Sequence, residues 1–354
     1  MTRYLLRRGL SSLVALFIFL TLFFFIAQIA LPGDYFSQFL IPGPLRNLLR
    51  SEAGLDQPLV IQYLIWVQGL LTGDLGLSLR GTPVSEVIWN ALPTTMIVFF
   101  VGGGIGFLTG FWLGKLTGWR KHSPLLDALT FGGIALYTSF PPWLAFMMAY
   151  LFAAQLKVFR LSPTIEMMQL GRWFELGRNV IEARLLLMMG VVLVLVIGVS
   201  AVLNKLLKWR VPPVLFIILP VVAALAGAYL WGFGDEAREA YLINGLPIVI
   251  FAILSFGEVM VIMQTNIRET LYEEYTTTAR AKGLSERRIR DRHAAPNALI
   301  PVLSRTVISV PYLLSGLVII EFALEIRGVG SLLFLSTLQQ DFPVVMGILV
   351  LIGL

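Results

Sequence analysis

The sequence predicts an all-α polytopic membrane protein, and three observations carry that prediction. Of its 354 residues, 57% are hydrophobic and only 14% are charged, whereas soluble domains carry about 25% charged residues. Several apolar runs are long enough to cross about 30 Å of hydrocarbon at about 1.5 Å per residue. Lys and Arg gather beside these runs, so the net charge of +6 reflects the membrane surface and the topology, and we expect no nucleic-acid partner.

The composition also excludes several kinds of chemistry. There is no cysteine, and the two histidines, His122 and His293, lie far apart, so we predict no disulfide and no metal site. Gly114-Lys115 is followed by Leu116 and therefore does not complete a phosphate-binding loop. Neither Gly-x-Ser-x-Gly nor His-Glu-x-x-His occurs. We predict a chain that is not an enzyme and holds no cofactor of its own.

Residues 1–31 are predicted to form the first transmembrane span. Arg3, Arg7 and Arg8 precede an apolar run that is longer than the core of a signal peptide. These arginines place the N-terminus in the cytoplasm. Residues 32–91 follow as an external loop region, because their charge is balanced and turn-forming residues are frequent.

Residues 92–156 are predicted to contain the second and third spans. The second, over 92–119, carries glycines at intervals of four, which lie on one helix face and permit close approach of a neighbouring helix. They are Gly102, Gly106, Gly110 and Gly114. The third, over 125–156, is interrupted by Pro141-Pro142.

Residues 157–244 are predicted to form an inserted amphipathic segment and two extra spans. Ser162-Pro163 is a good helix start for a mixed-charge stretch that extends to Arg184. Two apolar runs, 185–203 and 211–233, follow around a basic turn. An added pair of spans restores the original sidedness. The acidic residues after the pair are expected outside: Asp235, Glu236 and Glu239.

Residues 245–354 contain the remaining spans. The span over 246–267 carries Glu258, and a carboxylate within an apolar span is costly enough to suggest a function. Glu258 could contact a substrate's amino group, or pair with Arg305 or a partner subunit. The span over 298–322 contains two prolines, and the last apolar run, from Val344, is too short to span. We expect the protein to continue past the last residue of this sequence.

Residues 268–297 are predicted to form a charged helical hairpin between two spans. Acidic residues open its first helix and basic residues close it, in agreement with the helix dipole. Gly283 follows where a left-handed residue ends a helix, and Ser285 can cap the second helix. The other residues of this pattern are Glu269, Glu273, Glu274, Arg280, Lys282, Glu286, Pro296 and Pro301.

The hairpin resembles the coupling loop, or EAA motif, of ABC-importer permeases, in particular the first membrane subunit of the dipeptide, oligopeptide and nickel family. The resemblance rests on Glu274–Gly283 and on Arg292–Pro301, with Ala279 and Gly283 at the small positions. Thr277 and Thr278 stand where the motif has Glu and Ala. Further similar segments are Leu31–Asp34, Gly54–Pro58, Gln62-Tyr63, Gly73–Ser78, Tyr137–Trp143, Glu321–Leu333 and Asp341–Val345.

The resemblance implies an ABC type I importer permease fold of about six family spans, with residues 157–244 as an inserted pair. It implies import of peptides or similar small solutes, including nickel chelates and oligosaccharides, across a bacterial or archaeal cytoplasmic membrane. The implied partners are membrane lipid, a second homologous permease, an extracytoplasmic substrate-binding protein and two cytoplasmic ATPases, which hold ATP and magnesium.

The resemblance also implies site residues. The expected ATPase-coupling residues are Tyr275, Ala279, Arg280, Ala281, Lys282, Gly283, Leu284 and Arg287. The expected residues of the translocation path are Tyr137, Pro141, Glu258 and Pro311, although the Pro141-Pro142 pair could equally serve only to kink its helix. An ion-coupled secondary transporter with Glu258 as the protonation site is the alternative, and it leaves the hairpin unexplained.

Overall fold

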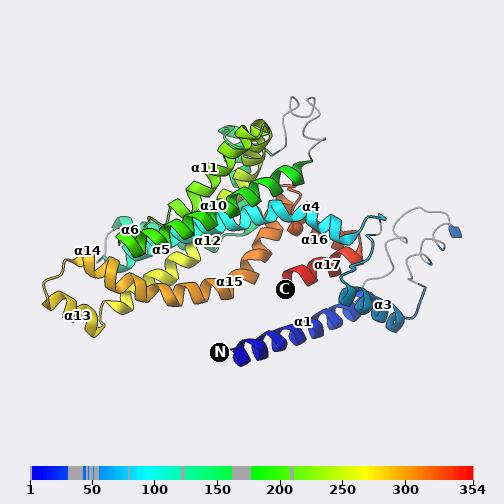
Figure 1. Ribbon diagram of the computed structural model, residues 1–354, viewed down its shortest axis with the longest axis horizontal. Helices are drawn as coiled ribbons and strands as arrows, with labels where there is room; N and C mark the ends of the chain where they lie inside the picture. The colour runs from blue at the N-terminus through cyan, green and yellow to red at the C-terminus, as the bar shows by residue number, and fades with distance from the viewer. Residues whose placement is uncertain are drawn as a thin grey trace. The chain divides into compact units, whose positions relative to one another are not determined.

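The computed structural model describes residues 2–30, 56–78, 80–120, 124–161, 177–207 and 211–353, together with four single positions, 43, 44, 47 and 51. These residues are almost entirely helical, and no strand longer than an isolated bridge occurs among them (Figure 1). They form two compact units, one of Met1–Leu92 with Ser331–Leu354 and one of Pro93–Gly330. The predicted all-α class is confirmed.

Within the described residues, five helices are long and apolar enough to cross a membrane. A sixth crossing results if the helix pair Pro124–Tyr137 and Pro141–Gln155, bent by 107°, forms one span. The predicted interruption at Pro141-Pro142 is therefore confirmed. The five helices are Leu6–Ile29, Val84–Trp119, Arg178–Leu207, Gly234–Thr270 and Glu286–Ala323, and the shorter apolar helices are Leu59–Thr72, Leu215–Leu230, Val329–Leu338 and Phe342–Gly353.

The first unit contains a helix that the sequence interpretation assigned to a loop. α3 (Leu59–Thr72) lies inside the stretch 32–91 and packs on α1 (Thr2–Ala30). The Phe24 ring of α1 lies 5.4 Å from the Tyr63 ring of α3. Turn residues flank this helix, but its interior is apolar, with aromatic residues spaced to face one neighbour. The sequence interpretation missed this helix because it was based on the flanks, and the external position of residues 32–91 stays a prediction.

Two of the segments similar to the permease family meet in this unit. The Ser78 hydroxyl donates a 2.6 Å hydrogen bond to Asp341, and both residues are buried. Asp341 immediately precedes α17 (Phe342–Gly353), the short last helix. The segments 31–34, 52–55 and 162–176, on which other parts of the prediction fall, lie outside the described residues.

The second span begins earlier than predicted. It comprises α4 (Val84–Ile97), a π-helical turn over Val98–Gly102 and α5 (Gly103–Trp119). The prediction placed its start at residue 92 because polar residues precede it. Those polar residues, Ser85 and Glu86, are exposed, whereas Val84 and Ile88 are buried on the opposite face. α4 is therefore amphipathic from its first turn.

The predicted glycine seam is confirmed, and it joins α5 to α12 (Gly234–Thr270). A Cβ atom on Gly110 would lie 2.5 Å from the carbonyl oxygen of Phe256, and one on Gly106 would lie 2.9 Å from that of Ala252. The seam extends to Gly118, a fifth member that the prediction left out. The facing carbonyls belong, in order, to Ile248, Ala252, Phe256, Met260 and Gln264.

The register of the seam shows that α5 and α12 run parallel, since the facing residue advances by four along α12 for every four along α5. Parallel spans must be separated by an odd number of crossings. The bent pair α6 (Pro124–Tyr137) and α7 (Pro141–Met148), followed by α10 (Arg178–Leu207) and α11 (Leu215–Leu230), provides such a number if each crosses. This is the arrangement that an inserted pair requires.

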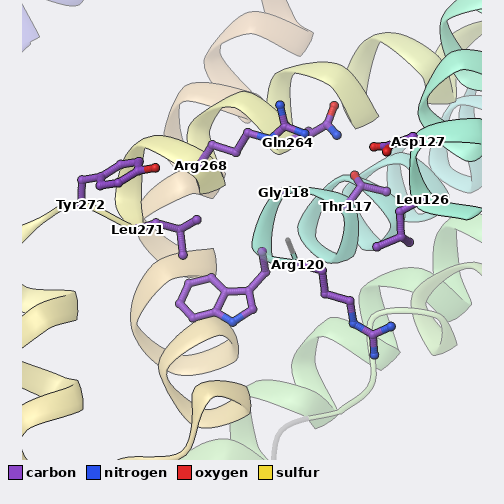
Figure 2. A pocket seen from close by; sticks show the side chains of 10 residues that line it. Thr117, Gly118, Arg120, Leu126, Asp127, Gln264, Arg268, Leu271 and Tyr272 are labelled. Carbon is purple, nitrogen blue, oxygen red and sulfur yellow. The ribbon is translucent and has the colours of Figure 1, made fainter. Parts of the chain in front are cut away.

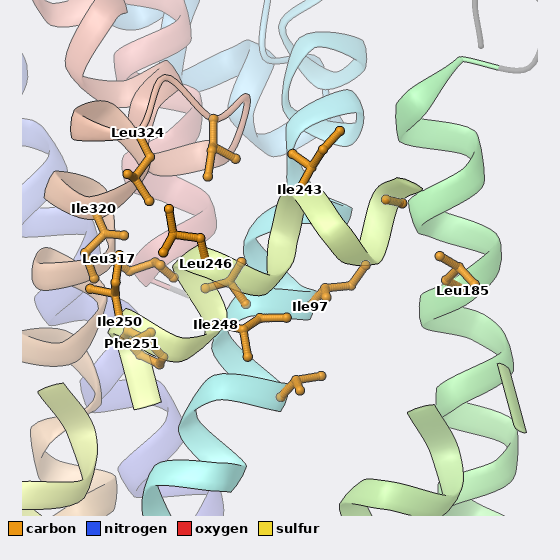
Figure 3. Close-up of a cluster of buried hydrophobic side chains, with 14 of the residues drawn as sticks. Ile97, Leu185, Ile243, Leu246, Ile248, Ile250, Phe251, Leu317, Ile320 and Leu324 are labelled. Atoms are coloured by element: carbon orange, nitrogen blue, oxygen red, sulfur yellow. The ribbon is translucent and has the colours of Figure 1, made fainter. Parts of the chain in front are cut away.

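The main hydrophobic core of the second unit surrounds the first half of α12. Figure 3 shows Leu246 and Ile250 of α12 near Leu317 and Ile320 of α15 (Ala295–Ala323), and Ile243 of α12 belongs to the same cluster. Ile97 of α4 and Leu185 of α10 belong to the same cluster. α12 is thus the central helix of this unit, and its neighbours pack around it.

The acidic residues that precede the predicted sixth span belong to α12, the helix that contains this span. Asp235, Glu236 and Glu239 lie within its first turns, and the last two are only 4% exposed. Glu239 accepts two hydrogen bonds from the Arg160 guanidinium, at 2.8 and 2.7 Å. These acids stabilise the helix N-terminus through its dipole.

A buried polar cluster anchors the first turn of α10 to the core. Glu182, which has no solvent exposure, accepts hydrogen bonds from Arg178 and Asn244 at 2.8 Å each. Thr94 of α4 also donates to it. The cluster joins α10, α4 and α12, and the sequence interpretation did not identify it.

Candidate functional site

The predicted hairpin is present, and its turn has the expected geometry. α13 (Glu274–Ala281) is followed by Gly283, whose φ of +72° is the left-handed conformation that favours glycine. Ser285 caps α14 (Glu286–Ile289) and accepts a 3.4 Å hydrogen bond from the Arg288 N–H. The local sequence signals at the turn are therefore confirmed.

Both outer boundaries of the hairpin differ from the prediction. α12 continues to Thr270, so Glu269 closes that helix and does not open the hairpin. On the other side, α14 continues through a π-helical turn over Arg290–Ala294 into α15, and Pro296 does not end the helix. Proline is tolerated there because it occupies the first turn of the α-helical segment. The second arm is thus continuous with a span.

The predicted coupling residues lie on α13, on the turn after it and on α14, and only some of them are exposed. Ala279 is buried and Leu284 half-buried, and the Leu284 N–H donates to the Ala279 carbonyl at 3.2 Å. The Tyr275 hydroxyl is buried and has no hydrogen-bond partner among the described residues. The exposed members of the set are Arg280, Ala281, Lys282, Gly283 and Arg287.

Arg280 is engaged within the chain. Its Nε donates to Glu286 at 2.9 Å, which joins the two arms of the hairpin. Its guanidinium carbon also lies 5.8 Å from the ring centroid of Trp119, at the end of α5, within the range of a cation–π interaction. Arg280 therefore holds the hairpin closed and against α5.

Tyr137 and Glu258, two of the predicted path residues, lie on a shared polar face. Tyr137 of α6 is within electrostatic range of Glu258, Arg305 and Tyr312. The Ser309 hydroxyl lies 2.6 Å from a Glu258 carboxylate oxygen and 2.9 Å from the Arg305 carbonyl, so its single proton serves one or the other. This face combines a carboxylate, a guanidinium cation and two phenols from three helices.

The two predicted path prolines occupy different positions. Pro141 is in the first turn of α7, directly after the 107° bend. Pro311 lies inside α15, next to Tyr312, and is exposed. The bend exists because proline at 141 and 142 cannot donate to the end of the preceding helix.

A pocket of about 440 Å³ lies where α5 ends, α6 begins and α12 ends. Figure 2 shows Arg268 and Gln264 on the side of the pocket where Asp127 lies, whereas Arg120 points away from this group. The guanidinium groups of Arg120 and Arg268 therefore do not converge on one ligand in this pocket. In the part of the chain that the structure describes, no group of three or more His, Asp or Glu residues could hold a metal ion.

The fold and these sites define an integral, multi-pass, all-helical membrane protein with a charged hairpin at one end of its spans. Comparison with known families then identifies it. The family described as "Binding-protein-dependent transport system inner membrane component" matches residues 104–354, and "Binding-prot-dependent transport system membrane comp, N-term" matches residues 1–98. The chain belongs to this family of transport-system membrane components, as the hairpin predicted.

Individual relatives agree. The oligopeptide transport system permease protein AppB of Bacillus subtilis is 26% identical over 99% of this chain and 92% of its own length. The dipeptide transport system permease protein DppB of Lactococcus lactis subsp. cremoris is 27% identical over 98% of this chain and 90% of its own length. The chain is therefore similar to ABC-importer permeases along nearly its whole length.

Proposed function

We propose that this membrane component forms the translocation path of an importer for peptides or similar small solutes, driven by two cytoplasmic ATPases. The hairpin carries the proposal, because it is a rigid charged element fused to two spans, α12 and α15. The names of the relatives, an oligopeptide and a dipeptide permease, support the solute class. ATP and magnesium belong to the ATPases, and this chain holds no cofactor.

In this proposal the hairpin turn enters a cleft on an ATPase. The exposed small residues Ala281 and Gly283 allow close approach, while Lys282 and Arg287 can reach acidic or carbonyl groups. Ala279, Leu284 and Tyr275 shape the turn from beneath. Arg280 keeps the two arms together through Glu286, so that the hairpin moves as one piece.

The polar face around Glu258 would line the path. A peptide carries an ammonium group at one end and a carboxylate at the other, and Glu258 and Arg305 offer a charge of each sign within reach of Tyr137. The bend at Pro141 and the exposed Pro311 lie on two of the elements that form this face, the bent pair α6–α7 and α15. Such helix breaks are tolerated in a span where they border a cavity.

Sidedness follows from charge. Arg3, Arg7 and Arg8 favour a cytoplasmic N-terminus in a bacterial or archaeal cytoplasmic membrane. If α11 crosses as well as the bent pair, an even number of crossings precedes the hairpin, which then faces the cytoplasm. The remaining partners would be a second homologous permease, membrane lipid and an extracytoplasmic substrate-binding protein.

Purification of the chain from its native membranes in mild detergent, followed by mass spectrometry of what stays bound, tests the proposal. We expect a second permease and one or two P-loop ATPases. A chain that is recovered alone and still transports after reconstitution would contradict the proposal. That result would favour an ion-coupled transporter in which Glu258 is protonated.

A further inference from the structure

One face of α5 is fastened to the hairpin. Phe107, Phe111, Lys115 and Trp119 recur at intervals of four, so they share a face. This stripe lies one residue beyond the glycine stripe that packs on α12. Phe107, Phe111 and Trp119 contact the hydrophobic cluster that contains Ala294, Ala295 and Ala298, at the junction between the hairpin and α15.

Lys115 is the charged member of this stripe and makes an ion pair with the hairpin. Its Nζ lies 3.0 Å from Asp291 Oδ1, and its side chain is only 14% exposed. Nζ also lies 5.8 Å from the centroid of the Phe111 ring, which gives the ammonium group a second favourable contact. The Lys115 ammonium group therefore has two partners within the protein, the Asp291 carboxylate and the Phe111 ring.

Asp291 is held in place from its own side. Arg290 donates two 2.9 Å hydrogen bonds, one to each carboxylate oxygen. The hydrogen bond from Arg290, and then the interaction with Lys115, outweigh the opposing effect of partial burial and lower the pKa of Asp291 to about 2. The carboxylate is thus charged at neutral pH. It lies in the π-helical turn that connects the hairpin to α15, a feature often found at functional sites.

The two arms of the hairpin are thus attached to one face of α5. The first arm reaches Trp119 through Arg280, and the second arm reaches Lys115 through Asp291. The adjacent face of α5 is in close backbone contact with α12 through the glycine seam. A displacement of the hairpin cannot leave α5 behind without breaking these contacts, and α5 cannot move without α12.

We propose that Lys115 and Asp291 form the joint through which a displacement of the hairpin is transmitted to α5, so that the hairpin, α5 and α12 move as one body. Lys115 is then a positioning residue that acts through Asp291. This inference rests on the proposed coupling to an ATPase. A fully exposed ion pair stabilises little; here Lys115 and Arg290 are only 14% and 13% exposed, although Asp291 itself is 42% exposed.

The absence of cysteine allows a direct test that needs no known substrate. Thr109→Cys places a single thiol on the exposed side of α5, and its rate of reaction with a maleimide is measured in the assembled transporter with and without ATP. We expect ATP to change this rate several-fold. In Thr109→Cys/Lys115→Met the ATP effect should weaken several-fold, while ATP hydrolysis continues, because the glycine seam and Arg280 still connect α5 to the hairpin.

Arg292→Gln provides the matched control, because Arg292 is an exposed cation of the same turn, next to Asp291, and the ATP effect should persist in it. An unchanged ATP effect in the Lys115→Met protein would overturn the inference, as would a wild-type background in which ATP has no effect on the thiol. A chain that retains no ATPase would instead overturn the proposed function, so the two failures are distinguishable.

A cross-link supplies a second measurement that does not depend on losing the pair. An assembled transporter that carries Lys115→Cys/Asp291→Cys joined by a short bifunctional maleimide should hydrolyse ATP at the rate of the uncrosslinked wild-type transporter, because the two positions stay together throughout the cycle. Inhibition of ATP hydrolysis by the cross-link would mean that the hairpin must separate from α5, and would overturn the inference.

Discussion

Two apolar helix pairs of the second unit are held together in different ways. α5 and α12 meet through glycines whose missing side chains let the helix backbones touch. α10 and α11 also pack on each other (Figure 1), but a Cβ atom on Gly190 or Gly198 of α10 would meet nothing within 4 Å. Gly227 of α11 would only make an ordinary contact with Met188.

The difference shows that glycine in an apolar helix indicates close packing only where it recurs with the period of one face. The five seam glycines, Gly102 of the π-helical turn and four of α5, recur every four residues, whereas the two of α10 do not continue as a stripe. α10 is instead fixed by a polar contact at its first turn, where Glu182 joins Arg178, Asn244 and Thr94. α5 is thus held to α12 along its length, whereas α10 is held to α4 and α12 at one end.

The largest expected effect therefore comes from breaking the end that holds α10. Glu182→Ala leaves Arg178 and Asn244 without their buried acceptor, and loss of one partner of a buried charged pair costs about 3–5 kcal/mol. Because Arg178 is 19% exposed, we expect the lower end of that range. The thermal unfolding midpoint in detergent should fall clearly.

Glu182→Gln is the matched control, because its amide oxygen can still accept from Asn244 and Arg178. Its amide nitrogen can donate to the Thr94 hydroxyl. Its midpoint should lie between those of the wild type and Glu182→Ala. Equal midpoints for all three proteins would contradict the view that this cluster anchors α10.

The next prediction is that the same substitution, Gly→Ala, changes stability in opposite directions in α5 and in α10. Gly110→Ala places a methyl group 2.5 Å from the Phe256 carbonyl oxygen, and overpacking of this kind costs about 1–3 kcal/mol. Gly198→Ala places the same group in open space, where alanine is the better helix former by about 1 kcal/mol. We expect the unfolding midpoint to fall for the first and to stay or rise for the second. A fall of equal size in both would show that the seam has no special role.

The sequence allowed the hairpin turn and the seam to be predicted because both depend on local signals. Gly283 predicts a turn and Ser285 predicts a helix cap from a few neighbouring residues, and a period of four indicates one helix face in any context. Which helix faces the seam was not predictable, since α12 begins more than a hundred residues later.

The buried clusters could not be predicted for the same reason. Glu182 receives its hydrogen bonds from Asn244 and Thr94, which are 62 and 88 residues away. The second stripe of α5 is visible in the sequence at Phe107, Phe111, Lys115 and Trp119, but nothing in that stripe indicates that Asp291 lies opposite. Boundaries failed where polar residues occupy one face of a helix, as at Ser85 and Glu86 of α4.

The contacts of Glu258 could serve either the packing of α12 on α15 or the binding of a substrate, and the two roles can be told apart. Its carboxylate has an intramolecular partner, the Ser309 hydroxyl at 2.6 Å, and that hydroxyl can turn instead to the Arg305 carbonyl. A substrate ammonium group could therefore take the carboxylate without leaving Ser309 unsatisfied. If Glu258 serves transport, the loss of its charge should lower the affinity for substrate and leave the packing of the adjacent glycine seam unchanged.

Glu258→Gln keeps the size and the hydrogen bond but removes the charge, so the unfolding midpoint should change little. A hydrogen bond to a charged group contributes about 1.5–3 kcal/mol, and we expect apparent affinity for a peptide with a free amino terminus to fall about 10-fold. The same peptide with an acetylated amino terminus should bind the two proteins equally, and Ser309→Ala should affect neither peptide strongly. Equal loss for both peptides, or a lower unfolding midpoint, would assign Glu258 to packing between α12 and α15.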